Sequence, residues 1–265
     1  MKVAAWLSGL LVAFSAVFGL GAAELNYSSE LEKVFTDRQA SGVVVLFDEQ
    51  QSAWLTNDLQ RALKPYIPAS TFKVPHSLLL LENEVVKDHH SQFAWDGVKH
   101  GYSSWNQDHS FASALRYSVV PIYQQLAREL GPERMAAGVN LLNYGNRDIS
   151  GEIDSFWLQG ELAITAVEQI DFLRALYHQT LPLSLRSQAI VKQMMLLPGE
   201  GNGTWFGKTG YATRPQQKVG WFVGWYQLPN RVIFFALNMD VDDPHLLPLR
   251  QKLVKQALQQ RISAL

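Results

Sequence analysis

The chain has 265 residues, of which 47% are hydrophobic and 18% are charged, and its formal net charge is −1. This composition predicts a globular protein with a full core, and the near-neutral charge does not favour nucleic acid or an anionic membrane as a partner. The chain has no cysteine and its 7 histidines lack a metal-binding spacing. We therefore expect neither disulfide bonds nor a metal site.

Residues 1–23 have the pattern of a cleavable signal peptide, with Lys2, an apolar run over Val3–Leu20, and small residues at Gly21, Ala22 and Ala23. The apolar run approaches the length that spans a bilayer, so a membrane anchor is the alternative. The embedded glycines and the small residues at the exit favour cleavage. We expect a periplasmic or secreted protein without stable membrane association, with one domain over residues 24–265.

The expected elements follow hydrophobic periodicity and turn residues along the chain. The first are a helix and a strand hairpin, over Ser29–Arg38, Gly42–Phe47 and Ser52–Thr56. Helices dominate residues 58–203, with segments over Pro121–Leu130, Pro132–Leu142, Thr165–His178 (opened by a capping box with Glu168) and Ser184–Leu197. Three strands and a helix then follow, over Thr204–Thr209, Val219–Leu228, Val232–Met239 and Pro244–Ile262.

This order predicts an α+β fold. Hairpin connections indicate an antiparallel sheet built from both ends of the chain, residues 24–57 and about 204–265. The helical segment, about 58–203, is then a subdomain inserted into the sheet subdomain. We expect a cleft where the two meet.

Ser70 and Lys73 form a Ser-x-x-Lys motif ahead of the apolar run Leu78–Leu81, so the motif is expected to open a buried helix. Residues three apart lie on one helix face, which brings the Lys73 amine toward the Ser70 hydroxyl. A serine hydroxyl becomes a nucleophile when an adjacent base takes its proton, and a helix N-terminus suits a developing oxyanion. The alternative is a capping serine followed by a solvated lysine, which the apolar neighbours Phe72 and Val74 argue against.

Three further motifs follow in order: Ser118-Val-Val120 at a break between helices, Tyr144-Gly-Asn146 in a loop, and Lys208-Thr-Gly210 at the end of a strand. Each alone could be a helix cap, a turn or a strand end. Together with Ser70-x-x-Lys73, they resemble the penicillin-recognising serine enzymes, and most closely the class D serine β-lactamases, or oxacillinases. A class A enzyme would carry Ser-Asp-Asn in place of Ser118-Val-Val120.

The resemblance covers essentially the whole mature chain, and Trp157-Leu158 also matches. It implies the β-lactamase/transpeptidase-like fold and hydrolysis of the β-lactam ring of penicillins and related antibiotics, which confers resistance. Trp157-Leu-x-Gly160 and Tyr211 after Lys-Thr-Gly resemble the carbapenem-hydrolysing branch. The resemblance implies β-lactams as substrates and a monomer or homodimer.

The resemblance also implies the catalytic roles. Ser70 attacks the lactam carbonyl, and the backbone N–H groups of Ser70 and Tyr211 form the oxyanion hole. Burial lowers the pKa of a lysine far enough to leave a neutral amine. In this family that amine, here Lys73, adds CO₂ to become N6-carboxylysine, the general base. Ser118 relays a proton to the lactam nitrogen together with Lys208. No cofactor is expected besides CO₂ or bicarbonate.

The remaining implied roles are support and binding. Trp157 donates its indole N–H to the carbamate, while Val120 and Leu158 line the path of the deacylating water. The ordinary interpretation of these three apolar residues is core packing. The groups expected to contact substrate are Thr209, Gly210 and Arg250, which would hold its carboxylate end, and Tyr102 and Trp105, which would form an apolar wall.

Two positions concern the substrate spectrum. Arg214 lies in a short loop after Tyr211, and Gln159 stands where relatives can carry an acid able to pair with such an arginine. Because a neutral glutamine cannot form that ion pair, we expect good penicillin turnover and weak to moderate carbapenem turnover.

Two other functions fit the motifs, a β-lactam sensor domain and a penicillin-binding peptidase, both of which acylate without turnover. Such proteins normally carry membrane spans, anchors or extra domains, and the sequence pattern predicts only the signal peptide.

Overall fold

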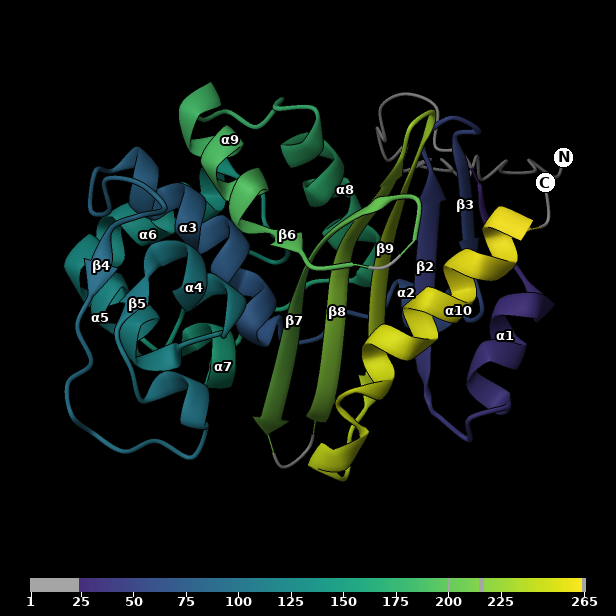
Figure 1. The fold of residues 1–265 in the computed structure, drawn as a ribbon, viewed down its shortest axis with the longest axis horizontal. Helices are drawn as coiled ribbons and strands as arrows, with labels where there is room; N and C mark the ends of the chain where they lie inside the picture. Colours follow the sequence, from purple (N-terminus) through teal and green to yellow (C-terminus); the bar gives the residue numbers. More distant parts are fainter. Residues whose placement is uncertain (1–23, 200, 215–216, 264–265) are drawn as a thin grey trace, which may run out of the picture.

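The computed structural model describes residues 24–199, 201–214 and 217–263, so the expected signal peptide lies outside the described residues. A seven-stranded sheet, in the order β1-β3-β2-β9-β8-β7-β6, forms its centre (Figure 1). The first three of these strands come from the start of the chain and the rest from its last third. The predicted α+β class, with a sheet built from both ends of the chain, is confirmed.

The central strands are β1 Leu25–Tyr27, β2 Gly42–Asp48, β3 Ala53–Thr56, β6 Leu196–Leu197, β7 Thr204–Arg214, β8 Gln217–Leu228 and β9 Arg231–Asp240. All neighbours pair antiparallel except β1 and β3, which are parallel. A second, two-stranded sheet joins β4 Gln92–Phe93 to β5 His109–Ser110.

The α-helices are α1 Ser29–Thr36, α2 Leu59–Ala62, α3 Lys73–Glu82, α4 Phe111–Arg116, α5 Val120–Leu130, α6 Pro132–Leu141, α7 Phe156–Gln159, α8 Ala166–Tyr177, α9 Leu185–Met194 and α10 Leu249–Ser263. Three short 3₁₀ helices are η1 Ala69–Phe72, η2 Ser103–Trp105 and η3 Pro244–Leu246. Among the described residues, no helix combines the length and apolarity needed to cross a bilayer.

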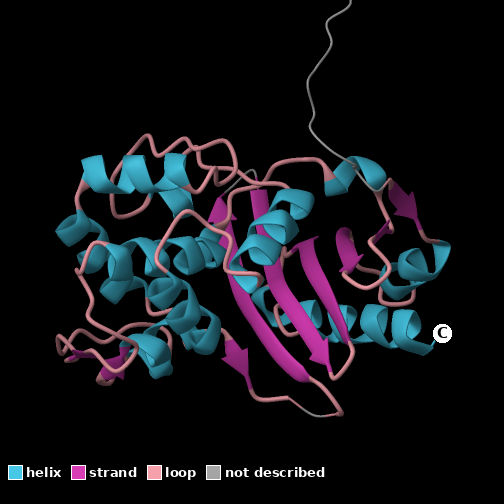
Figure 2. Ribbon diagram, turned by 90° about the horizontal axis from the view of Figure 1, so that it is seen from above, coloured by secondary structure: helices cyan, strands magenta, loops and turns pink. Residues whose placement is uncertain are grey.

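The two faces of the sheet are covered by different layers of helix. Strand β2 is apolar on both faces because Val43, Val45 and Phe47 enter the core shared with the helical segment, while Val44 and Leu46 pack with α1 and α10. In Figure 1, α10 and α1 lie on one side and α3 to α9 on the other, and Figure 2 shows the same division from above. Burial on both faces explains the continuous apolar run that marks β2 in the sequence.

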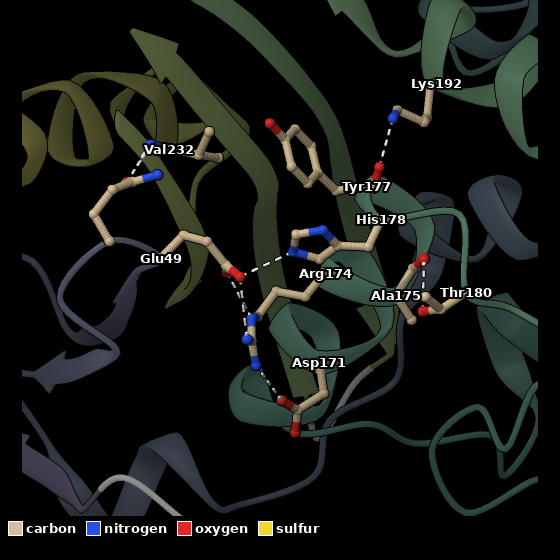
Figure 3. Close-up of polar contacts among 10 residues, drawn as sticks. Glu49, Asp171, Arg174, Ala175, Tyr177, His178, Thr180, Lys192 and Val232 are labelled. Atoms are coloured by element: carbon tan, nitrogen blue, oxygen red, sulfur yellow. Dashed lines mark hydrogen bonds and ion pairs between the residues drawn. The ribbon is translucent and has the colours of Figure 1, made fainter. Parts of the chain in front are cut away.

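Helix α8 joins the helical segment to the sheet. Its predicted capping box is present: Glu168 N donates to Thr165 Oγ1 at 3.0 Å, and Thr165 N donates to the Glu168 carboxylate at 2.8 Å. Near its other end, Arg174 and His178 both contact Glu49 in the turn after β2 (Figure 3). The cap fixes where the helix begins, and the ion pair fixes where it docks.

Several predicted boundaries are wrong. The helix expected over Ser184–Leu197 ends at Met194, because Leu196–Leu197 pairs with β7 as β6. The strand expected to end at Thr209 continues to Arg214, since β8 supplies a partner along its whole length. The terminal helix begins at Leu249, after the 3₁₀ turn η3. Strands β1, β4 and β5 were not predicted, because runs of two or three residues show no period.

Candidate active site

Ser70 lies in η1, which continues directly into α3 at Lys73. Ala69 has a left-handed backbone with φ of 48°, a conformation that costs energy for a residue with a side chain and sets the direction in which η1 begins. Lys73 Nζ donates a hydrogen bond to Ser70 Oγ at 3.1 Å. The predicted approach of these two groups on one helical turn is therefore observed.

The two side chains differ in their exposure. Ser70 retains 7% of its surface and Lys73 retains 0%. Burial disfavours an ammonium ion and lowers the pKa of Lys73 to about 7. A solvated lysine, the ordinary alternative for this motif, is thereby excluded, and a large share of Lys73 is a neutral amine at neutral pH.

The pocket around Lys73 is aromatic. Its Nζ lies 5.1 Å from the ring centroid of Tyr123, and Phe72 stacks on Trp157 with centroids 5.7 Å apart. The Trp157 Nε1–H is buried and has no acceptor among the described residues. An unpaired donor in this pocket fits an anionic group carried on Lys73, such as a carbamate.

Ser118 and Lys208 form a second polar pair in the site. Ser118 stands between α4 and α5 with a left-handed φ of 57°, and Lys208 donates hydrogen bonds to Ser118 Oγ and, at 2.8 Å, to the Thr209 carbonyl. Burial, with Lys73 and Arg250 nearby, holds the pKa of Lys208 well below its usual value. The pair can pass a proton between a hydroxyl and an amine.

Strand β7 approaches Ser70 closely because Gly210 has no side chain. A Cβ at this position would lie 3.0 Å from the Pro68 carbonyl oxygen and 3.3 Å from the Thr71 amide nitrogen. The backbone N–H of Gly207 donates to the Met195 carbonyl. After Gly207, this edge of β7 has no strand partner among the described strands. The backbone of β7 at Gly210, just before Tyr211, therefore lies next to the 3₁₀ helix η1 that carries Ser70.

Arg250, near the start of α10, reaches back to the sheet. Its Nη1 donates to the Gly210 carbonyl at 2.5 Å and its Nε to the Leu247 carbonyl at 2.7 Å. A Cβ on Gly220 would lie 2.9 Å from Arg250 Cδ, so this glycine makes room for the side chain. Burial lowers the pKa of Arg250 to about 10, which leaves the guanidinium charged at neutral pH.

Three comparisons with known proteins agree on the family. The model of the penicillin-binding protein transpeptidase domain matches residues 34–259. The chain is 46% identical to the β-lactamase OXA-48 of Klebsiella pneumoniae over 260 residues, 98% of each chain, and 40% identical to OXA-10 of Pseudomonas aeruginosa over 235 residues, 88% of each. The crystal structure of FUS-1 (OXA-85), a class D β-lactamase from Fusobacterium nucleatum subsp. polymorphum, aligns with a TM-score of 0.86 and 38% identity, covering 89% of this chain and 98% of that one.

The chain belongs to the class D β-lactamase family. The family predicted from the four motifs is thus confirmed.

In this class D β-lactamase the predicted site residues are brought together in two layers. A cleft of about 380 Å³ is lined by Ser70, Ser118, Val120, Leu158, Thr209, Gly210, Tyr211, Arg250, Tyr102 and Trp105. Lys73, Trp157 and Lys208 lie beneath it, buried. Tyr102 is 54% exposed, and its ring lies 4.8 Å from that of Trp105, centroid to centroid, at the mouth of the cleft, where an apolar wall was expected.

The cleft of this class D enzyme has further lining residues that the sequence did not indicate, namely Ser104, Arg116, Tyr117, Thr213 and Leu247. Arg116 and Tyr117 directly precede the Ser118 motif, a neighbourhood that could have suggested them. A second cleft of about 190 Å³ shares Trp105 but contains neither Ser70 nor Ser118. The chemistry therefore belongs to the larger cleft.

Arg214 of this β-lactamase has an acidic partner after all. Its Nη2 donates to Glu161 Oε1 at 3.0 Å, so a carboxylate two residues after Gln159 forms the ion pair that Gln159 cannot. The pair links the end of β7 to the loop after α7, which carries Leu158. The sequence did not indicate this ion pair, because Glu161 and Arg214 meet only after the loop has folded.

Proposed function

We propose that the protein hydrolyses the β-lactam ring of penicillins and related antibiotics through an acyl-enzyme on Ser70. The observation that carries this proposal is the Ser70–Lys73 hydrogen bond of 3.1 Å, made by a lysine with no exposed surface. This contact places the base carried on Lys73 within reach of the Ser70 hydroxyl proton. Resistance to β-lactams is the expected consequence for the cell.

Acylation requires a bond to form and a proton to travel. Ser70 Oγ attacks the lactam carbonyl carbon, the carbonyl electrons move to oxygen, and the base at Lys73 takes the hydroxyl proton. The backbone N–H groups of Ser70 and Tyr211 stabilise the oxyanion, where one donor is typically worth a factor of about 10²–10³ in rate. The C–N bond then breaks, and Ser118 gives its proton to the leaving nitrogen and is reprotonated through Lys208.

Lys73 is the residue that adds CO₂. The neutral amine attacks the carbon of CO₂, a C–N bond forms, and one proton leaves to solvent, which yields a carbamate with one negative charge. Trp157 donates its free indole N–H to that anion. The carbamate supplies the basic oxygen for acylation and again for the deacylating water, whose path Val120 and Leu158 line.

The positively charged side of the cleft binds the carboxylate of the substrate. Arg250 keeps its charge beside the Gly210 carbonyl, and Thr209 lines the same cleft, so a substrate carboxylate can bind there. The Glu161–Arg214 ion pair orders the loop beside Leu158. Because Glu161 supplies the carboxylate whose absence at Gln159 was the reason to expect weak carbapenem turnover, we infer turnover of both penicillins and carbapenems, to be measured as kcat/KM for ampicillin and imipenem. An imipenem rate equal to that without enzyme would refute the carbapenem part.

The first experiment mixes purified residues 24–265 with a large molar excess of a chromogenic cephalosporin and follows ring opening. Sustained turnover supports a β-lactamase. A burst of one equivalent followed by a stall supports the sensor or peptidase alternatives, which the matching transpeptidase domain model also accommodates. The Ser70→Ala variant, which lacks the nucleophile, gives the background rate.

Export to the periplasm or the medium is part of the proposal. It rests on the basic, apolar and small-residue pattern of residues 1–23. N-terminal sequencing of protein from the periplasmic fraction tests it, and Glu24 is the expected first residue. Retention of residues 1–23 on membrane-bound protein would support an anchor instead.

A further inference from the structure

His76 lies on α3 one turn after Lys73, on the same side of the helix. It has no exposed surface. Its ring centroid is 5.5 Å from that of Trp157 and 5.4 Å from that of Tyr123, the ring that also lies 5.1 Å from Lys73 Nζ. His76 therefore shares the aromatic pocket of Lys73, although none of the four motifs includes it.

Both ring nitrogens of His76 are buried without a hydrogen-bond partner among the described residues. A neutral imidazole carries one N–H donor and one acceptor nitrogen, and each costs about 1–3 kcal/mol when it is buried unpaired. Leucine or phenylalanine would fill this apolar position without that cost. A buried polar group of this kind calls for a compensating function or a bound polar group.

The neighbouring Trp157 has the same property, since its Nε1–H is also buried and unpaired within the described part of the chain. Two unpaired polar rings in contact, next to the same lysine, point to a common anionic partner in that pocket. A buried carbamate has two oxygens with several lone pairs, which Ser70 and Trp157 do not exhaust. A buried anion needs every available donor.

The protonation state of His76 suits this role. Burial and the neighbouring Lys73 lower the pKa of His76 to about 3, so the imidazole is neutral throughout the working range. A neutral ring donates a hydrogen bond without adding a second positive charge beside Lys73. It therefore leaves the Lys73 amine uncharged and able to react.

We propose that His76 is a positioning residue for carboxylated Lys73, and that its imidazole N–H supplies a donor to the carbamate, directly or through one buried water. This inference rests on the carbamate of the proposed function. His76 makes no contact with substrate in this arrangement. It raises the affinity of Lys73 for CO₂ and holds the modified side chain in place.

The test is a ¹³C NMR titration of the carbamate carbon with ¹³C-bicarbonate at fixed pH, on the wild type and variants. His76→Phe keeps a planar ring and removes the donor, and His76→Gln retains a donor. We expect His76→Phe to need about tenfold more bicarbonate for half carboxylation, equivalent to about 1.4 kcal/mol. His76→Gln should recover most of this, and saturating bicarbonate should restore kcat in His76→Phe.

The matched control is Trp225→Phe, which removes another buried, unpaired ring N–H, from β8, where Trp225 stacks on Phe206. Its bicarbonate titration should equal that of the wild type. A wild-type titration in folded His76→Phe would overturn the role of His76. If that variant does not fold, the ring ¹⁵N resonances of His76 in the wild-type protein decide, because they must shift when bicarbonate is added, and constant resonances overturn the inference.

The same samples test the carbamate hypothesis and the hydrolase hypothesis separately. Absence of a carbamate signal in the wild type at every bicarbonate concentration would overturn both the role of His76 and the modification of Lys73. Sustained ring opening by that sample would still support the hydrolase.

Discussion

Two polar clusters in contact with the helical segment are built in opposite ways. Around Lys73 the polar groups are buried in aromatic surroundings, and Trp157 and His76 lack partners within the described residues. Around Glu49 the charges are paired: Arg174 Nε donates to its carboxylate at 3.0 Å and His178 Nε2 lies 2.9 Å from it (Figure 3). The first arrangement lowers the pKa of the Lys73 amine to about 7 and so prepares chemistry, while the second stabilises the docking of α8.

Replacing the base should give the largest effect and separate activity from stability. In Lys73→Met, we expect kcat/KM to fall by about 10³–10⁴, because the general base is lost. Thermal unfolding should show no loss of stability, because methionine fills the site without a buried amine. A variant with near wild-type turnover would show that another group takes the Ser70 proton.

The stability of Lys73→Met should also depend on pH differently from that of the wild type. Lys73 loses its proton above about pH 7 in the folded protein but only near 10.5 when unfolded, so the unfolded state binds more protons between these values and wild-type stability rises with pH there. Lys73→Met should lose the part of this rise that comes from Lys73 and keep the part that comes from Lys208, whose pKa is also held well below its usual value. Urea unfolding at several pH values from 7 to 10 measures the difference, and identical slopes would contradict the burial of an ionisable amine.

The activity of the wild type should depend on pH and CO₂ together. Below about pH 7 the Lys73 amine is increasingly protonated and cannot react with CO₂, and carbamate formation itself releases a further proton, so the rate in degassed buffer should fall by at least about tenfold per pH unit. Added bicarbonate should move the midpoint to lower pH. Initial rates with and without bicarbonate at pH 5 to 8 measure this, and superimposable curves would favour unmodified Lys73 as the base.

Replacing Arg250 removes the guanidinium from the cleft and should weaken substrate binding. We expect Arg250→Ala to raise KM for ampicillin by about 10–100-fold, the range for a charged hydrogen bond, with a smaller change in kcat. Arg250→Lys, which keeps the charge but loses the fork of donors, should fall between the two. Equal KM values in wild type and Arg250→Ala would place the substrate carboxylate elsewhere.

Substitutions in the ion-paired cluster around Glu49 should change the free energy of unfolding and leave the activity unchanged. Partial burial opposes ionisation of Glu49, but hydrogen bonds from Arg174 and His178 prevail and hold its pKa below 4.5. The stability that ionised Glu49 contributes is therefore present above pH 4.5. It is lost as the pH falls through the pKa that Glu49 has in the folded protein. Glu49→Gln should cost about 1 kcal/mol at pH 7 and progressively less as the pH falls below 4.5, with kcat unchanged. Asp171→Asn, whose contact with Arg174 is 4.0 Å, is the control with a smaller effect.

The smallest effect is expected at the loop beside Leu158. Glu161→Gln removes the ion pair with Arg214, which is partly exposed and so worth little in stability. We expect a change of about 2–5-fold in the ratio of imipenem to ampicillin kcat/KM, from a looser loop. Gln159→Asn, a change at the neighbouring neutral position, is the control and should leave the ratio unaltered.

Much of the catalytic centre was predictable because its geometry is local. Ser70 and Lys73 are one helical turn apart, and the capping box of Thr165 and Glu168 lies within four residues. Backbone geometry fixes such pairs once the helix forms. The apolar runs of β2, β8 and β9 likewise predicted buried strands. The short strands and the end of β7 were missed, because their partners are distant in sequence.

The sequence by itself determined the family, the placement of Ser70 and Lys73 one helical turn apart, and a sheet built from both chain ends, since motifs and hydrophobic periods are written in neighbouring residues. Only the tertiary structure decided that Glu161 is the partner of Arg214 and that Gly210 lets β7 approach Ser70. It also decided that His76 and Trp157 have no hydrogen-bond partner within the described residues in the aromatic pocket around Lys73. Burial and long-range contacts set these features, and both depend on segments that meet only after the chain has folded.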